Sequence, residues 1–172
     1  LVALRQTNVV RLLAYSSIAQ AGYMLVPFAV AGENAEALAS AQTATIVYIL
    51  IYAGMNLGAF AVVIALARKT RSGEITSYGG LLNYAPGLTL LMTIFLFSLA
   101  GIPPLGGWFA KLYIFRAALD AGTPAAVVLA VIAGVNSVIA LFYYANIAKE
   151  MWMSPVPDED RTPVRVPPAL AT

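Results

Sequence analysis

The sequence predicts an all-α integral membrane protein, a transmembrane helix bundle that contains one proline-interrupted helix. The first observation is composition: 60% of the residues are hydrophobic and only 10% are charged, whereas a soluble domain has roughly 45–50% apolar and about 25% charged residues. The second is a set of nearly uncharged runs long enough to cross the roughly 30 Å hydrocarbon core of a bilayer. The third is a pair of prolines, Pro103 and Pro104, inside one of these runs.

The chain contains neither cysteine nor histidine. This composition excludes disulfides, thiolate-held iron–sulfur clusters, histidine-ligated haem and the usual zinc sites. We therefore expect no cofactor and no metal on this chain, and any redox chemistry must take place on another one. The formal charge of +2 is spread over loops, so nothing indicates a nucleic-acid groove.

The first predicted span runs from Leu12 to Ala31, an uncharged stretch of the length that a transmembrane helix needs. The span is not uniformly apolar. Its polar side chains form a seam: Tyr15, Ser16, Ser17, Gln20 and Tyr23. A short acidic loop with Glu33 and Glu36 follows.

The second span is predicted over residues 43–67 and the last over residues 124–147. In the second span, Gly54 and Gly58 form a GxxxG pattern, which lets two helices approach closely in lipid. Asn56 lies between these glycines. Its amide either serves packing alone or lines a hydrated path, and the residues themselves leave both readings open.

Between residues 88 and 119 an apolar stretch is broken by Gly101, Pro103 and Pro104. A straight helix of this length would measure about 48 Å, too long for one span, whereas two full spans with a turn would need roughly forty residues. The stretch is either one long interrupted helix or two short helices joined by a tight turn. Irregular backbone at membrane depth persists only where it is buried in protein or lines a wet cavity.

These segments divide the chain into three parts. Residues 1–11 read as the end of a preceding helix and a loop, residues 12–150 as a transmembrane bundle of four to five helices, and residues 151–172 as an exposed, proline-rich polar tail that is disordered or extended. We take the chain to be a fragment of a longer membrane protein. Arg5, Arg11 and the 68–74 cluster are expected on one side of the membrane, which the positive-inside rule assigns to the cytoplasm. Glu33 and Glu36 are expected on the other side.

Lys111 is the residue that most strongly indicates function, because it follows the helix break inside an apolar stretch. A lysine near the bilayer centre costs about 2.5–3.5 kcal/mol on insertion scales. A buried lysine can be switched between its charged and neutral forms by a nearby charge, which is what a proton-transfer step requires. The alternative is that Lys111 extends its aliphatic stem to the membrane surface. Arg116 and Asp120 are expected at that surface.

Three segments resemble the antiporter-like subunits of respiratory NADH–quinone oxidoreductase (complex I). The segment that begins at Arg11, RLLAYSSIAQAGY, resembles the family's KRLLAYSSIAHAGY. The segment around Asn56, MNLGAFAVV, is similar to the corresponding segment of subunit N and its mitochondrial counterpart. The segment that ends at Lys111, SLAGIPPLGGWFAK, is similar to the family's SLAGIPPxxGFxxKF. The three follow one another in the family's order.

The resemblance implies a larger subunit with two inverted five-helix repeats, each with an interrupted helix. This chain would be a C-terminal fragment that holds most of the second repeat, and residues 88–119 would count as two helices. Lys111 would be the family's essential lysine, a proton relay. A polar axis beside it would contain Arg11, Tyr15, Ser16, Ser17, Gln20 and Asn56.

The resemblance also implies partners and a location. The chain would belong to a multi-pass membrane subunit in the inner or plasma membrane of a bacterium, in contact with lipid and other membrane subunits of the complex, and with no nucleic acid. It would be a non-redox subunit of an H⁺-translocating enzyme, with no catalytic centre of its own. Quinone, FMN and iron–sulfur clusters would be held by other subunits.

Two positions depart from the family pattern. Val10 stands where the family usually has lysine, and Gln20 stands where it often has histidine. A glutamine can orient water but cannot titrate, which argues against a histidine relay there. Two other functions remain open: a subunit of a multi-subunit cation/proton antiporter, and a structural membrane subunit whose lysine only stabilises the bundle.

Overall fold

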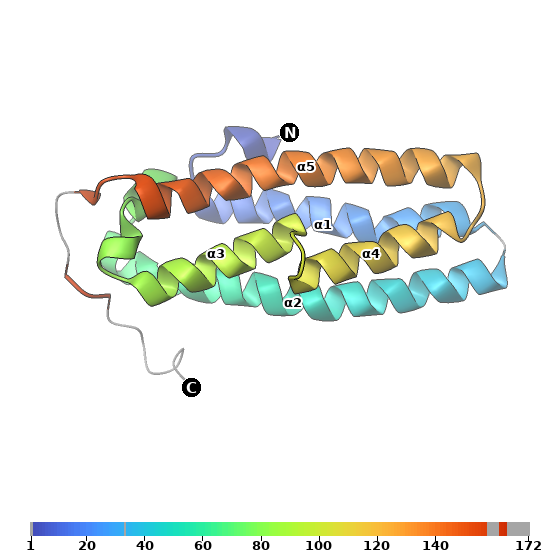
Figure 1. Cartoon of the computed structure of the whole chain (residues 1–172), viewed down its shortest axis with the longest axis horizontal. Coiled ribbons are helices and arrows are strands. Elements are labelled where there is room, and N and C mark those ends of the chain that lie inside the picture. The colour runs from blue at the N-terminus through green and yellow to red at the C-terminus, as the bar shows by residue number, and fades with distance from the viewer. Residues whose placement is uncertain (1, 33, 158–161, 165–172) are drawn as a thin grey trace.

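The computed structural model describes residues 2–32, 34–157 and 162–164. Within them the chain forms five α-helices: α1 (Val9–Ala31), α2 (Ala35–Thr70), α3 (Pro86–Ala100), α4 (Gly106–Leu119) and α5 (Pro124–Met153). Short 3-10 helices lie at Val2–Arg5, Ile75–Tyr78 and Leu81–Asn83. The helices run side by side in one elongated bundle (Figure 1), and the described ranges contain no β-strand. The all-α prediction is confirmed.

Local sequence sets most of the helix starts. The side chains of Asn8, Asn34 and Thr123 accept hydrogen bonds from backbone N–H groups in the first turns of α1, α2 and α5. These N–H groups have no partner within the helix, so a capping oxygen stabilises the end. Pro86 and Pro124 occupy first-turn positions, where the missing N–H costs nothing. Because of these caps, α1 and α2 begin earlier than the apolar runs at residues 12 and 43 suggest.

Three helices, α1, α2 and α5, are long and apolar enough to cross a membrane, and α3 is apolar but shorter. The 36 residues of α2 extend over about 54 Å, more than a bilayer core requires. Side chains that face away from the bundle are mostly large and aliphatic, such as Leu50, Leu57 and Val138. The chain is therefore an integral membrane protein. Between its helices, close packing and hydrogen bonds carry the association, because lipid tails are as apolar as the side chains.

The interrupted stretch forms two short helices that lie end to end and together follow one passage along the bundle (Figure 1). α3 has 15 residues and α4 has 14, so each measures only about 21–23 Å. Neither is long enough to cross the hydrocarbon core alone. The sequence left open one long interrupted helix or two short helices joined by a tight turn, and the structure has two short helices, as the resemblance implied.

The segment after α2 ties the start of α1 to the end of α2. Val9 N–H donates to the Gly73 carbonyl at 2.7 Å, and Ile75 N–H donates to the Thr7 carbonyl at 2.7 Å. Arg11 and the 68–74 cluster therefore lie at the same end of the bundle, as predicted. The first turn of α2, which contains Glu36, lies at the opposite end (Figure 1). Glu33 lies outside the described residues.

Only one of the two glycines in the GxxxG pattern lies at a close helix contact within the chain. A Cβ atom on Gly58 would lie 2.3 Å from the ring of Phe95, so this glycine lets α2 and α3 approach closely. A Cβ atom on Gly54 would meet nothing within 4 Å. The expectation of close helix contact is thus correct for Gly58 and wrong for Gly54 within this chain.

The last helix is longer than the sequence indicated. α5 continues to Met153, beyond the predicted end at residue 147, and Met151 is completely buried. Met151 belongs to the same buried cluster as Ile75, Tyr78 and Leu81 of the 3-10 segments. The proline-rich tail therefore begins later than residue 151. Much of that tail, residues 158–161 and 165–172, lies outside the described residues.

Candidate functional site: a buried lysine at the helix break

The site is built around the last turn of α3, where the chain leaves the helix. Gly101 adopts a left-handed conformation with φ of 90°, and its N–H donates to the carbonyls of Phe97 and Ser98. The Ile102 N–H also donates to Phe97. These bonds satisfy two of the four carbonyls that a helix end leaves without partners. The carbonyls of Leu99 and Ala100 remain, and both point into the bundle toward side-chain donors.

Lys111 donates to one of these two carbonyls. Its Nζ lies 2.6 Å from the Ala100 oxygen and 2.6 Å from Ser137 Oγ on α5. Ser137 Oγ in turn donates to the same Ala100 oxygen at 3.1 Å. Lys111 is only 4% exposed, so its stem does not extend to the membrane surface. The C-terminal end of a helix carries partial negative charge, and the end of α3 therefore stabilises the ammonium group.

Gln20 holds the neighbouring carbonyl. Its Nε2 donates to the Leu99 oxygen at 3.2 Å, and its Oε1 accepts a hydrogen bond from the Tyr48 hydroxyl on α2. The side chain is 1% exposed. Gln20 and Lys111 thus bind adjacent carbonyls of one helix end, and Gln20 fixes the break from the α1 side. This contact gives the glutamine a structural reason to stand where the family often has histidine.

The polar seam of α1 continues from Gln20 toward the basic end of the bundle. Ser16 Oγ and the hydroxyl of Tyr144 on α5 share a hydrogen bond, and the Tyr144 ring packs edge-on against Tyr143 with 4.6 Å between centroids. On the other side of the seam, the Tyr52 hydroxyl donates to Ser17 Oγ at 2.7 Å. Hydroxyl groups from α1, α2 and α5 therefore form a cluster next to the helix break, in which Ser16 and Tyr144 are buried and Ser17 and Tyr52 are half-buried.

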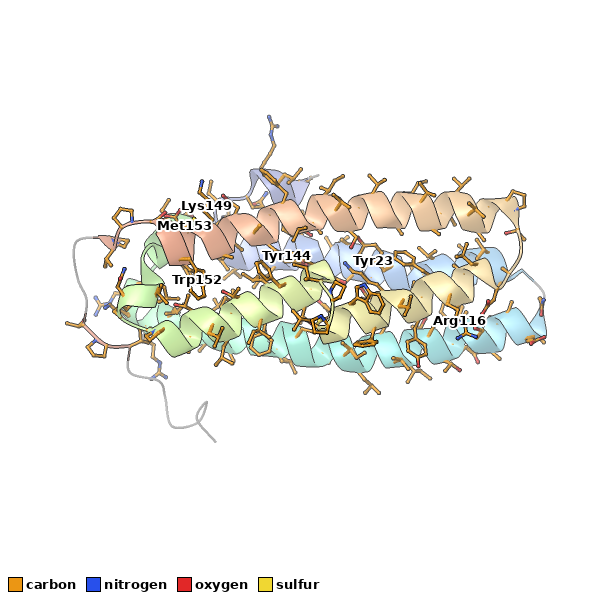
Figure 2. All side chains as sticks on the ribbon, in the orientation of Figure 1. Tyr23, Arg116, Tyr144, Lys149, Trp152 and Met153 are labelled. Carbon is orange, nitrogen blue, oxygen red and sulfur yellow. The ribbon has the colours of Figure 1, made fainter. Side chains whose placement is uncertain are left out.

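Tyr23 completes the surroundings of the lysine. The Lys111 Nζ lies 5.0 Å from the centroid of the Tyr23 ring, within the range of a cation–π interaction. The Tyr23 hydroxyl is buried and has no hydrogen-bond partner within the described part of the chain. Figure 2 shows Tyr23 and Tyr144 inside the bundle, with Arg116 near the end of α4. Arg116 and Asp120 are both exposed there.

The sequence-predicted axis falls into two groups. Ser16, Ser17 and Gln20 lie in the cluster beside Lys111, and the predicted break at Gly101, Pro103 and Pro104 separates α3 from α4. The other three members of the axis, Arg11, Tyr15 and Asn56, lie outside the cluster.

Helical periodicity explains this division. Positions 16, 20 and 23 share the inward face of α1, whereas Arg11 and Tyr15 lie on the outward face. In α2 the inward positions include Tyr48 and Met55, and Asn56 is rotated away from them by about 100°. The Asn56 side chain is only partly buried and makes no hydrogen bond among the described residues. The side chain of Asn56 thus lies apart from the cluster in this chain, and its place in the axis stays a prediction.

Four side chains of the site were not among the residues predicted from sequence: Tyr48, Tyr52, Ser137 and Tyr144. Tyr144 follows Asn136 and Ser137, the polar pair in the middle of α5. A tyrosine near the end of a membrane helix also fits a membrane-surface position. A helical count from Ser137 would have placed Tyr144 two turns along the same face of α5, which is the signal that could have found it.

Comparisons with known proteins agree with this architecture. The family described as NADH:quinone oxidoreductase/Mrp antiporter, TM matches residues 1–137. The NAD(P)H-quinone oxidoreductase subunit 2 of the Mesostigma viride chloroplast is 45% identical over 158 residues, which cover 92% of this chain and 30% of that protein. The NADH-quinone oxidoreductase subunit N 2 of Sorangium cellulosum is 45% identical over 167 residues, or 96% of this chain and 32% of that protein.

A third relative, the NADH-quinone oxidoreductase subunit N of Trichlorobacter lovleyi, is 42% identical over 171 residues, which are 98% of this chain and 33% of that protein. The chain thus spans about a third of the length of the curated relatives that it matches. The family match covers most of the chain and includes the whole helix break with Lys111. The chain accordingly belongs to the NADH:quinone oxidoreductase/Mrp antiporter transmembrane family.

Proposed function

We propose that this chain is part of a subunit of the N type in NADH–quinone oxidoreductase, and that it passes protons through the membrane arm of that complex. The names of the relatives support this assignment. The observation that carries the proposal is the position of Lys111, a buried ionisable side chain on α4 whose Nζ donates to the last carbonyl of α3. Such groups inside membranes face polar cavities and mark ion or proton paths.

The surroundings of Lys111 suit both of its protonation states. An ammonium group has three N–H donors. Two of them have acceptors in the Ala100 oxygen and Ser137 Oγ. The third has no hydrogen-bond acceptor among the described residues, and we assign it to a proton-transfer partner. The negative end of α3 stabilises the charge. Arrival of a proton on Nζ is therefore matched by acceptors that are already in position.

Loss of the proton is accommodated by Ser137. When the neutral amine moves away from the Ala100 oxygen, the Ser137 hydroxyl still donates to that oxygen. The buried carbonyl then keeps a partner, which avoids the cost of an unsatisfied polar group. Gln20 continues to hold the Leu99 carbonyl in both states. Ser137 and Gln20 act here as positioning residues, and Lys111 is the group that carries the proton.

In this proposal the chain performs no redox chemistry. FMN, iron–sulfur clusters and the quinone are held by other subunits, and charge movements that accompany quinone reduction change the protonation of Lys111. The partners are the other membrane subunits of the complex and the lipid bilayer. The membrane is the inner or plasma membrane of a bacterium.

The second candidate is a subunit of a multi-subunit cation/proton antiporter, because the matching family includes Mrp antiporters. Affinity purification of the full-length protein from its native membrane separates the two. We expect NADH–quinone oxidoreductase activity to copurify with it. Copurification of sodium-dependent proton exchange without NADH oxidation would instead assign the antiporter function.

A substitution at Gly101 tests whether the break positions the lysine. A Cβ atom there would lie 2.9 Å from Lys111 Cδ and 3.2 Å from Nζ, at a φ of +90°. Gly122 is the matched control, because it also has a positive φ, of +65°, but a Cβ atom there would meet nothing within 4 Å. A positive φ costs a residue with a Cβ atom about 1–2 kcal/mol, so we expect each alanine variant to lose about this much stability. Only Gly101→Ala is expected to lower NADH-driven proton uptake by membrane vesicles. An equal loss of proton uptake in both variants would contradict the proposal.

A further inference from the structure

Two buried tyrosines have hydroxyl groups without a hydrogen-bond partner among the described residues. They are Tyr23 on α1 and Tyr78 in the 3-10 helix Ile75–Tyr78. A buried donor or acceptor that stays unsatisfied costs the desolvation of that group. Native structures retain few such groups, and one that is retained calls for a role or for a partner that it meets in another state.

Tyr23 belongs to the immediate surroundings of the lysine amine. The centroid of its ring is 5.0 Å from Lys111 Nζ, and the ring shares a buried cluster with Ala110 and Ile114 of α4. Ser137 lies close enough to the Tyr23 hydroxyl to influence it, although no hydrogen bond joins the two side chains. The unpartnered hydroxyl of Tyr23 is therefore next to the group that we assign to proton transfer.

The partners of Lys111 Nζ among the described residues all suit its charged form. The Ala100 oxygen and Ser137 Oγ accept hydrogen bonds from Nζ. The face of the Tyr23 ring attracts a cation, because it carries the negative part of the ring quadrupole. None of these partners donates a hydrogen bond to the nitrogen. The site thus provides for the ammonium ion but offers no donor to the neutral amine.

The neutral amine needs such a donor. Loss of a proton leaves a lone pair on Nζ, and a buried acceptor without a donor is as costly as a buried donor without an acceptor. The Ser137 hydroxyl donates to the Ala100 oxygen, and Gln20 Nε2 donates to the Leu99 oxygen. The Tyr23 hydroxyl is a donor beside Nζ that has no such commitment among the described residues.

We propose that Tyr23 stabilises the neutral form of Lys111 by donating a hydrogen bond from its hydroxyl to the lone pair on Nζ. The bond is direct once the flexible lysine stem moves, or it passes through one water molecule, which would have polar partners in Tyr23, Lys111 and Ser137. Tyr23 keeps its own proton and acts as a positioning residue. The inference rests on the proposed relay at Lys111 and adds the group that stabilises the second state of that relay.

Tyr23→Phe in the full-length protein, within its complex, tests the proposal. The substitution removes the hydroxyl and keeps the ring, and because this hydroxyl has no partner among the described residues, assembly and thermal stability should not fall. We expect NADH-driven proton uptake per assembled complex to fall about fivefold, the change that loss of one hydrogen bond produces. Infrared difference spectra with ¹⁵N-labelled lysine, recorded before and after NADH addition, should show a correspondingly weaker lysine signal, which a purely structural role would leave unchanged.

Tyr78→Phe is the matched control, because it also removes a buried hydroxyl that has no partner among the described residues. This hydroxyl lies at the basic end of the bundle, in the segment after α2. Proton uptake and the lysine signal should stay at the unsubstituted level. An unchanged lysine signal in Tyr23→Phe, or equal losses of proton uptake in the two variants, would overturn the proposal.

A double variant separates failure of this inference from failure of the relay itself. If Tyr23 acts through Lys111, adding Tyr23→Phe to Lys111→Met should cause no further loss of the residual proton uptake. A further loss would overturn the proposal. If Lys111→Met lowers proton uptake and Tyr23→Phe does not, the relay stands and this inference is wrong. If Lys111→Met leaves proton uptake intact in an assembled complex, the relay is wrong and this inference is wrong with it.

Discussion

Replacing Lys111 with methionine should lower NADH-driven proton uptake by about tenfold or more, because positioned proton-transfer groups contribute about 10²–10⁴ to a rate. Methionine resembles the lysine stem in length and fills the same space. The Ala100 carbonyl keeps its hydrogen bond from Ser137 in this variant. Assembly of the complex should therefore survive. The measurement is proton uptake by inverted membrane vesicles or proteoliposomes on addition of NADH, with the amount of assembled complex determined in parallel.

Lys149 provides the matched control for this substitution. It is one of only three lysines in the chain, with Lys69 and Lys111, and it is exposed near the end of α5 (Figure 2). Lys149→Met removes the same charge from a solvent-accessible position, and proton uptake should remain at the unsubstituted level. If Lys111→Met also leaves proton uptake intact while assembly is normal, Lys111 is a structural residue and the proposed relay is wrong.

Gly107→Ala should cause the largest loss of stability of any single substitution considered for this chain. A Cβ atom at this position would lie 1.8 Å from the Ser98 carbonyl oxygen and 3.2 Å from Met55 Sδ. The obstacle is backbone at the end of α3, which cannot move without opening the break. Inserting even one methyl group into a well-packed interior costs about 1–3 kcal/mol and occasionally more, and we expect about 3 kcal/mol or more here. Thermal unfolding of the purified full-length protein in detergent would measure the loss.

The adjacent glycine separates this effect from a general cost of substitution at the helix start. A Cβ atom on Gly106 would lie 3.1 Å from Ile51 Cγ2, a side-chain methyl group that can move by a few tenths of an ångström. Alanine also favours helix over glycine by about 1 kcal/mol. Gly106→Ala should therefore change stability by less than about 1 kcal/mol. Comparable losses of stability for Gly106→Ala and Gly107→Ala would show that the junction of α3 and α4 is less tightly packed than described.

The fold was largely predictable because lipid imposes a simple pattern. The run from residue 12 to 31 and the Gly–Pro break after residue 100 are visible as composition alone, and both correspond to the observed helices and break. The helix starts were less predictable. Asn8 and Asn34 extend α1 and α2 beyond the apolar runs, because a capping side chain can begin a helix in polar sequence. Met151 stays helical through contacts with distant segments, which no local pattern records.

The site was predictable in its central residue and less so in its partners. Lys111 stands out because a charge in an apolar stretch is costly. Its partners come from tertiary structure: the Ala100 carbonyl is free only because α3 ends there, and Ser137 meets it only because α5 packs beside the break. The sequence also grouped Tyr15 with Ser16, although neighbours on a helix point about 100° apart. Helical direction, rather than proximity in sequence, decides which polar residues reach the lysine.

The central claim, that Lys111 gains and loses a proton during turnover, is tested most directly by infrared difference spectroscopy of the complex with ¹⁵N-labelled lysine. Spectra are recorded before and after NADH addition, and isotope-shifted bands report lysines that change protonation. The account predicts a lysine signal that disappears in Lys111→Met and persists in Lys149→Met. A signal that is unchanged by Lys111→Met, or the absence of any lysine signal in the unsubstituted complex during turnover, would contradict the account.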